Sequence, residues 1–310
     1  MTQVGIFGAN GFIGRHLTRA LVARGYNTVC FGRHFPLEFQ QELGSSVDMR
    51  LIDLRDDIGM QTKVRGITHV VQLINSSNAT TDNGTVVADI QSNLIPQVNF
   101  INSCIRSQVR SFIFLSSGGT VYGRPQVVPI HEDHPTMPLN SYGLIKLATE
   151  QYLRMLCRNT TMGFVILRVS NPFGPGQLGT GGQGLIGTIL QKYKRSQPLT
   201  IFGDGLSERD YLYIDDTVDA IIRGIEHEPL NEVVNVGSGE GRSILAVVAA
   251  VEAALGMPVL RDHVASRLTD APSNILDPTR AAKLLGWKTF TPFDVGLEKT
   301  VEWHLSRDSQ

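Results

Sequence analysis

Residues 3–14 read QVGIFGANGFIG, and this stretch decides the fold. Its apolar first half predicts a buried strand over 3–8, and a helix is expected from about Phe12 to Arg24. Between them stand Gly8, Gly11 and Gly14. Glycines at this spacing permit a tight turn, a close approach of the backbone to a pyrophosphate, and close packing of the helix on the strand. The phosphates then lie at the positive end of the helix. The stretch therefore predicts a dinucleotide-binding turn.

Further apolar runs alternate with helical stretches through the first two-thirds of the chain. The expected strands cover 27–32, 47–53, 68–74, 111–117 and 163–170. The expected helices cover 87–105, interrupted by Pro96, and 142–157. This alternation predicts an α/β fold with a parallel, doubly wound sheet. From about residue 172 the pattern loosens into glycine- and proline-rich segments. We expect a nucleotide-binding domain over 1–171 and a smaller substrate lobe over 172–310, interleaved with the first.

The composition argues against several classes of function. The 310 residues carry a net charge of −1, with a pI of about 6.7, which gives no electrostatic footprint for nucleic acid. There is no apolar run long enough to span a membrane. The first residues, MTQVGIFGAN, lack a basic segment and a cleavage site. Three cysteines lie far apart and fit neither a disulfide framework nor a metal site. We expect a cytoplasmic enzyme with reduced cysteines.

A tyrosine and a lysine, Tyr142 and Lys146, lie four residues apart in NSYGLIKLATEQYL (140–153) and so share one face of the expected helix. An ammonium near a phenol lowers its pKa, and the phenol can then exchange a proton with a substrate hydroxyl or carbonyl near neutral pH. Such a pair is common on ordinary helices. The strand FLSS (114–117), which ends in hydroxyls about twenty-five residues upstream, favours the catalytic interpretation.

Several ordered motifs resemble those of the extended short-chain dehydrogenase/reductases, the family of sugar-nucleotide epimerases, dehydratases and reductases. Besides the glycine turn and the Tyr142 motif, they are LSSGGTVYG (115–123), RVSNPFGPGQ (168–177), IFGDGLSERDYLYIDD (201–216), NVGSG (235–239) and LLGW (284–287). The resemblance covers nearly the whole chain. It implies a Rossmann lobe for NAD(P), a C-terminal lobe for a nucleoside-diphosphate sugar, and a Ser/Thr–Tyr–Lys triad.

The resemblance also assigns residues. Tyr142 becomes the acid/base, and Lys146 lowers its pKa and hydrogen-bonds a cofactor ribose. The family's third hydroxyl falls on Gly118, so Thr120 is expected to replace it, with Ser117 as the alternative. The residues expected to bind the cofactor are Gly8, Asn10, Gly11, Phe12, Ile13, Gly14, Arg33, Asp53, Leu54, Leu73, Tyr142 and Lys146.

On the substrate side, Asn171 is expected to contact the sugar nucleotide, and Arg209 and Arg267 its diphosphate, since a guanidinium suits a pyrophosphate. The histidines of HEDH (131–134) suggest a metal, but this loop lacks further ligand spacing and the family needs none. We expect no metal. The family often pairs through two helices, so a homodimer is expected.

Three reactions are open: reduction of a 4-keto sugar nucleotide, 4-epimerisation, and 4,6-dehydration. Dehydration needs a carboxylate pair beside the hydroxyl strand, where this chain has Gly118, Gly119 and Thr120. The sequence resembles both bacterial dTDP-4-dehydro-6-deoxyglucose reductases, which serve surface polysaccharide synthesis, and UDP-glucose 4-epimerases. A non-catalytic protein that senses NAD(P) is the remaining alternative, and the intact Tyr142 and Lys146 argue against it.

The end of the second strand, TVCFGRH (28–34), helps to decide between reduction and 4-epimerisation. An acidic residue there binds the adenosine ribose and repels a 2′-phosphate. Here stand Gly32 and Arg33, with no carboxylate before Glu38. Arg33 is expected to meet the 2′-phosphate, which favours NADPH over NADH, although both remain candidates. A reductase uses that pool at each turnover, so reduction is the favoured reaction.

Overall fold

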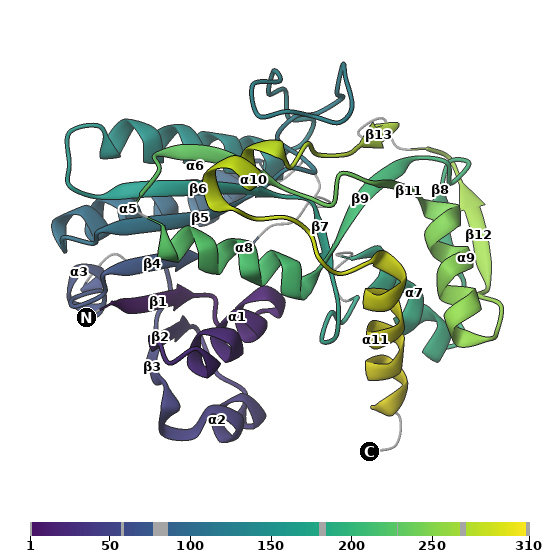
Figure 1. Ribbon diagram of the computed structural model, residues 1–310, viewed down its shortest axis with the longest axis horizontal. Helices are drawn as coiled ribbons and strands as arrows, with labels where there is room; N and C mark the ends of the chain where they lie inside the picture. Colours follow the sequence, from purple (N-terminus) through teal and green to yellow (C-terminus); the bar gives the residue numbers. More distant parts are fainter. Residues whose placement is uncertain are drawn as a thin grey trace.

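The strand predicted at residues 3–8 lies inside a sheet of seven parallel strands (Figure 1). This computed structural model describes residues 2–56, 59–76, 86–179, 184–227, 229–266 and 271–307. The strand order is β10-β6-β5-β4-β1-β2-β3. The bounds of these strands are β1 (Gln3–Phe7), β2 (Asn27–Gly32), β3 (Asp48–Leu51), β4 (His69–Gln72), β5 (Ser111–Ser117), β6 (Gly163–Val169) and β10 (Glu232–Val236). The doubly wound α/β fold expected from the sequence is confirmed.

Successive strand residues point to opposite faces of the sheet, and apolar side chains lie on both faces. Helices therefore cover both faces. Phe112 and Phe114 of β5 belong to the core under α5 and α6, whereas Ile113 and Leu115 belong to the core under α1 and α8. The helices of this part are α1 (Phe12–Ala23), α2 (Leu37–Leu43), α3 (Met60–Lys63), α4 (Val86–Asp89), α5 (Ile95–Arg106), α6 (Ser141–Cys157) and α8 (Ile214–Glu226), with a 3₁₀ turn η1 (Gly44–Ser46).

The helical segment predicted over 87–105 is continuous but irregular. A π-helical stretch, η3 (Ile90–Leu94), joins α4 to α5, and Pro96 lies in the first turn of α5. A proline cannot donate the backbone hydrogen bond of a regular helix interior, and here the irregular π-helical stretch directly precedes it. Pro96 therefore marks a helix start within the run and does not break it.

The strand order reverses between β1 and β4, which neighbour each other although β2 and β3 come between them in sequence. In open α/β sheets, ligands bind in the crevice at the carboxyl ends of the strands at such a reversal. The turn after β1 and the residues after β4 therefore frame the expected cofactor site.

The remaining elements form smaller layers beside this carboxyl edge (Figure 1). One sheet has the order β11-β9-β13, with β7 paired to β9, and another joins β12 to β8. The elements are β7 (Asn171–Phe173), α7 (Leu185–Lys194), β8 (Leu199–Phe202), β9 (Glu208–Tyr213), β11 (Gly241–Ser243), α9 (Ile244–Leu255), β12 (Arg261–Val264), β13 (Ser273–Asn274), α10 (Thr279–Leu285) and α11 (Phe293–Ser306). The chain returns to the large sheet through α8 and β10, and the predicted division at residue 171 stays a prediction.

The three cysteines, Cys30, Cys104 and Cys157, are buried and unpaired. Within the described ranges, no helix is long and apolar enough to cross a membrane.

Candidate cofactor and substrate site

The glycine turn joins β1 to α1 as the sequence predicts. Gly8 has a φ of +97°, a left-handed conformation that favours glycine. A Cβ atom on Gly14 would lie 2.2 Å from the carbonyl oxygen of Gly8, so only glycine allows helix α1 to approach the turn this closely. Helix α1 begins after Gly11 without a side-chain cap or an acidic residue in its first turn. Its first N–H groups are thus available to a phosphate, and the cradle fits a dinucleotide.

Four further predicted cofactor residues lie around this turn. The side chain of Asn10 donates to the carbonyl of His34 over 2.8 Å, which ties the turn to the exit of β2. Phe12, Ile13 and Leu73 are partly buried against the core. Leu73 follows β4, and a Cβ on Gly8 would lie 3.3 Å from its Cβ. The ends of β1 and β4 therefore meet at the reversal of strand order.

The exits of β2 and β3 bring Arg33 and Asp53 near each other. Arg33 is exposed and makes no hydrogen bond or ion pair with any residue that the structure describes. Asp53 accepts three hydrogen bonds from the side chain of Arg55, at 3.0, 3.2 and 2.5 Å. The Arg55 bonds, helped by the charge of Arg33, lower the pKa of Asp53 to about 2. Leu54, beside it, is buried. Asp53 is therefore an anion held by Arg55.

Tyr142 and Lys146 share one face of α6, as their spacing predicts. The side chain of Asn140 caps the helix by accepting from the backbone N–H of Gly143 at 2.8 Å. The Lys146 ammonium lies 5.7 Å from the centroid of the Tyr142 ring and donates to the carbonyl of Leu115 over 2.8 Å. This bond holds the helix against the end of β5, where the hydroxyl residues lie.

Burial dominates the protonation of both groups. It raises the pKa of Tyr142 to about 12, against a hydrogen bond with Ser117 that lowers it. Burial also lowers the pKa of Lys146 to about 8, against the charge of Glu150. Desolvation of the phenolate is the larger influence on Tyr142 and the Ser117 bond the smaller one, and the lowering of the phenol pKa by the Lys146 ammonium stays a prediction. At neutral pH Tyr142 is a phenol and Lys146 an ammonium.

The position where the family has its third hydroxyl is closed. A Cβ atom on Gly118 would lie 2.5 Å from a methyl group of Leu276, which is fully buried. Of the two candidates that flank this position, Ser117 hydrogen-bonds Tyr142. The hydroxyl oxygen of Thr120 is buried and has no partner among the residues that the structure describes. Ser117 is thus beside the phenol already, and Thr120 has an unused hydrogen-bonding group.

The substrate residues come together through the small sheet. Asn171, on β7, donates to the backbone carbonyl of Asp210 over 2.8 Å, and its side-chain oxygen lies 3.8 Å from where a Cβ on Gly119 would be. Arg209, on β9, donates to the carbonyls of Glu208 and Ala271, each over 2.8 Å. Arg267 lies outside the described residues.

Asn274 was missed by sequence reasoning. It pairs with Arg209 across β13 and β9, and it donates to the carbonyl of Gly118 over 3.2 Å. Its side-chain oxygen is buried without a partner among the described residues. The pairing joins segments 65 residues apart, so no local pattern could have indicated it.

The HEDH segment contacts protein groups. Glu132 accepts from the backbone N–H of Asn235 at 2.8 Å, and Asp133 is bonded to Arg280 at 2.8 Å. His134 accepts from the backbone N–H of Gln126 at 3.0 Å. Among the described residues, no group of three or more His, Cys, Asp or Glu side chains could hold a metal ion.

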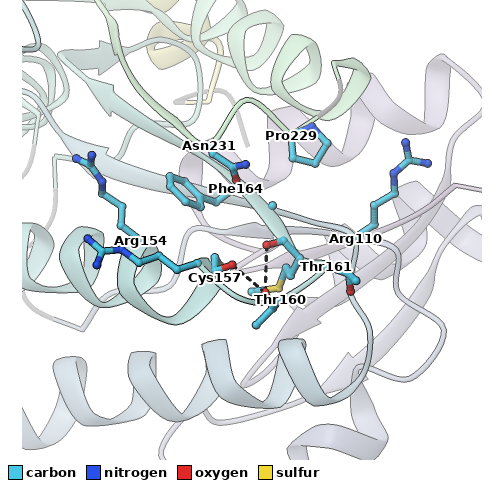
Figure 2. A pocket seen from close by; sticks show the side chains of 11 residues that line it. Arg110, Arg154, Cys157, Thr160, Thr161, Phe164, Pro229 and Asn231 are labelled. Carbon is cyan, nitrogen blue, oxygen red and sulfur yellow. Dashed lines mark hydrogen bonds between the residues drawn. The ribbon is translucent and has the colours of Figure 1, made fainter.

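A cavity of about 470 Å³ lies at the opposite edge of the sheet, where β6 begins. Figure 2 shows Arg110 and Arg154 on opposite sides of it, with their guanidinium groups far apart. None of the predicted site residues lines this cavity. The candidate site is therefore the carboxyl edge and not this depression.

Comparison with known proteins agrees with the fold. Residues 4–237 match the model of the NAD dependent epimerase/dehydratase family. The chain is 31% identical over 307 residues to a dTDP-4-dehydro-6-deoxyglucose reductase of Escherichia coli, with 96% of each chain covered. It is 30% identical over 314 residues to a UDP-glucose 4-epimerase of Mycolicibacterium smegmatis, with 97% of this chain and 98% of that one covered.

Two solved structures are close in shape. A UDP-glucose 4-epimerase of Thermotoga maritima with UDP-glucose superposes with a TM-score of 0.92 at 27% identity, over 100% of both chains. A UDP-glucose 4-epimerase of Thermus thermophilus in complex with NAD gives a TM-score of 0.89 at 27% identity, over 98% of this chain and 99% of that one. Reductase and epimerase relatives thus resemble the chain to a similar degree.

Proposed function

The chain belongs to the NAD-dependent epimerase/dehydratase family, and on this premise we propose that it reduces the C4 keto group of a nucleotide-activated 4-keto-6-deoxy sugar, such as dTDP-4-dehydro-6-deoxyglucose, with NADPH or NADH. The name of the Escherichia coli relative supports this substrate class. A place in bacterial surface polysaccharide synthesis and a cytoplasmic location belong to the same proposal.

The exit of β2, where Arg33 follows Gly32, is the observation that carries the choice of reduction, and the protonation of Tyr142 agrees with it. Burial keeps this phenol protonated at neutral pH, since its pKa is about 12. A reductase needs a proton donor beside the carbonyl oxygen, whereas an epimerase that starts from an alcohol first needs a base. The resting phenol therefore holds the proton that the reductive direction requires.

The chain's own groups would divide the work as follows. The glycine turn and the start of α1 would bind the pyrophosphate, and Lys146 would bind the ribose next to the nicotinamide. Bound NAD(P)H supplies the hydride. Tyr142 would donate its proton to the C4 oxygen, so that the carbonyl becomes a hydroxyl, and solvent would then reprotonate the phenolate. Ser117, bonded to Tyr142, and Thr120, with its unused hydroxyl, would orient the sugar.

The proposed substrate contacts are Asn171, Arg209 and Arg267. One nitrogen of Arg209 donates hydrogen bonds to two backbone carbonyls, and these bonds fix its side chain in place. Its other N–H groups remain for a diphosphate, which accepts charge-assisted hydrogen bonds. Structural neighbours with UDP-glucose support a nucleotide sugar as the ligand.

The preference for NADPH is proposed from the exit of β2. Arg33 is exposed there and directly follows Gly32, so the end of β2 itself carries no carboxylate that would repel a 2′-phosphate. Its charge already acts on Asp53, which shows that it lies close to the neighbouring strand exit. Solved neighbours contain NAD, so the protein is expected to accept both cofactors.

One experiment separates reduction from epimerisation. The protein is incubated with NADPH or NADH and dTDP-4-dehydro-6-deoxyglucose, and in parallel with NAD⁺ and UDP-glucose. We expect loss of the reduced nicotinamide absorbance, one equivalent of product per equivalent oxidised, and no UDP-galactose. Formation of UDP-galactose without net cofactor turnover would instead establish the epimerase.

The epimerase is the second candidate, and the solved structures with UDP-glucose and NAD favour it. A non-catalytic NAD(P) sensor is the third. It would bind cofactor in the same experiment and convert neither sugar.

We also propose that the protein is a homodimer. The outer surface of α6 exposes Leu144, Tyr152 and Met155, and the neighbouring helices expose Val87 and Ile95. Apolar side chains gathered over adjacent helices mark a contact surface. A second copy related by a two-fold axis would cover the same patch on both chains.

A further inference from the structure

A buried ion pair lies directly behind the proposed active-site strand. Glu150 follows Lys146 by one turn on α6, and Arg168 is on β6. Their side chains are 0% and 5% exposed. Arg168 donates to the two carboxylate oxygens of Glu150, over 2.6 Å from one nitrogen and 3.1 and 3.2 Å from another. A buried charge of this kind is kept only when its hydrogen bonds are satisfied.

The pair connects the strands that carry the proposed site. Ser116, which precedes Ser117 on β5, donates its hydroxyl proton to Glu150. Arg168 also donates to the hydroxyl of Tyr122 over 3.0 Å, and that hydroxyl donates to Asn235 of β10 over 2.7 Å. One network therefore fixes α6, β5, β6 and β10 to each other at the carboxyl edge of the sheet.

Among the charged groups around Lys146, Glu150 is the one that favours its protonated form. On its own helix Lys146 faces Tyr142 and Glu150, while β5 presents Phe114 and the carbonyl of Leu115. From β6, Arg168 brings a second cation to the same carboxylate. On α4, which packs against α6, the buried Asp89 is bonded to Asn93. Glu150 is thus paired with Arg168 and lies one helical turn from Lys146, and its charge opposes the loss of the Lys146 proton.

We propose that Glu150, held by Arg168, is a positioning residue that keeps Lys146 charged and in place for the cofactor ribose. The inference rests on the proposed function in one respect, the contact between Lys146 and the cofactor. Removing the carboxylate would remove the charge that opposes the desolvation of the Lys146 ammonium, and its pKa would fall further. The neutral amine would then bind the ribose hydroxyls more weakly at physiological pH.

The test is the affinity for NADH, measured without sugar between pH 6 and pH 9. The variants are Glu150→Gln, which removes the charge, and Glu150→Asp, which keeps it. The matched control is Asp216→Asn, since Asp216 is equally buried and holds the backbone of Phe290 and Thr291 from α8. In the wild type, affinity should fall as pH rises through about 8, the pKa of Lys146. His34 lies near the predicted adenosine site and is common to all variants, so its contribution cancels in the comparison.

In Glu150→Gln we expect the fall in affinity to begin about one pH unit lower, which makes NADH binding several-fold to ten-fold weaker at pH 7.5. Glu150→Asp should keep the wild-type pH dependence of NADH affinity. Asp216→Asn should lower the melting temperature and leave that pH dependence unchanged. A Glu150→Gln profile that coincides with the wild type overturns the inference.

If Glu150→Gln does not fold, the double variant Glu150→Gln/Arg168→Met removes the unpaired cation as well and takes its place in the titration. Its profile should still begin to fall at a lower pH than that of the wild type, because the carboxylate is gone. An unmoved profile overturns the inference here too. Failure of the proposed function gives a different result from failure of this inference. A wild-type protein that binds no NADH at any pH contradicts the cofactor site itself.

Discussion

Removing a single oxygen atom from Tyr142 separates binding from chemistry. In Tyr142→Phe, turnover should fall by about two orders of magnitude or more, the usual size of general acid catalysis. The dissociation constant for NADH should hardly change, because the partly buried ring keeps the same place. Steady-state rates with the sugar substrate and cofactor titration of the same preparation give both numbers. Turnover close to that of the wild type would remove Tyr142 from the proton transfer.

The charge of Arg33 should decide between the two cofactors. A guanidinium bonded directly to a 2′-phosphate contributes about 1.5–3 kcal/mol, so Arg33→Ala should weaken NADPH binding about ten-fold or more and leave NADH binding nearly unchanged. Arg65, an exposed arginine after α3, provides the control, and Arg65→Ala should change neither. Equal losses for both cofactors would mean that Arg33 stacks on the adenine, and the argument for NADPH would fail.

The site residues that the sequence could predict are those whose roles depend on short spacings. Tyr142 and Lys146 share a helix face, and the three glycines share a turn, so a single stretch of sequence indicates each set. Leu276 closes the Gly118 position from a strand end more than 150 residues away. Glu150 does lie four residues after Lys146, but its importance depends on Arg168 from another strand. The degree to which burial raises the pKa of Tyr142 depends on the packed neighbours and not on the motif.

The packing of Leu276 against Gly118, at the exit of β5, can be tested with a double-mutant cycle. Gly118→Ser alone should lower the melting temperature, because its Cβ meets the Leu276 methyl groups at 2.5 and 2.9 Å. Leu276→Ala alone should cost about 2–5 kcal/mol, as for other buried leucines. Together they should destabilise the protein by less than the sum, with a coupling of about 1 kcal/mol or more.

Leu285 on α10, also fully buried, serves as the control for that cycle. Gly118→Ser combined with Leu285→Ala should be additive, because the two positions share no contact. Denaturant midpoints of all six proteins measure the coupling. If the Leu276 cycle is additive as well, the hydroxyl is absent from position 118 for some reason other than lack of space.

At the level of whole elements, six strands of the large sheet were predictable because each is a short apolar run with its own turn signals. Their bounds in the structure are equal or one to three residues shorter. The seventh strand, β10, was not predicted, and neither were the strands of the smaller sheets, β7, β8, β9, β11, β12 and β13. Each of these is defined by a partner distant in sequence, so its own residues carry little signal.

For the molecule as a whole, the apolar face of α6 predicts self-association. Met155 is 53% exposed on this face. Met155→Glu would place a charge in the centre of the proposed contact, and the protein should shift from dimer to monomer in light scattering after size exclusion. Leu260→Glu, at an equally exposed leucine near β12, should leave the dimer intact. A wild type that is monomeric at micromolar concentration would contradict the proposal.

The return of the chain to the large sheet has a practical consequence. Strand β10 pairs with β6 along its whole length, and α8 covers the same face as α1. A fragment that ends at residue 171 would therefore leave the edge of β6 open and a helix-sized area of core uncovered, which favours aggregation. Two halves produced separately should remain insoluble, whereas the same halves produced together should reassemble and recover cofactor binding. The fold could thus serve as a split reporter, in which signal appears only when both halves are brought together.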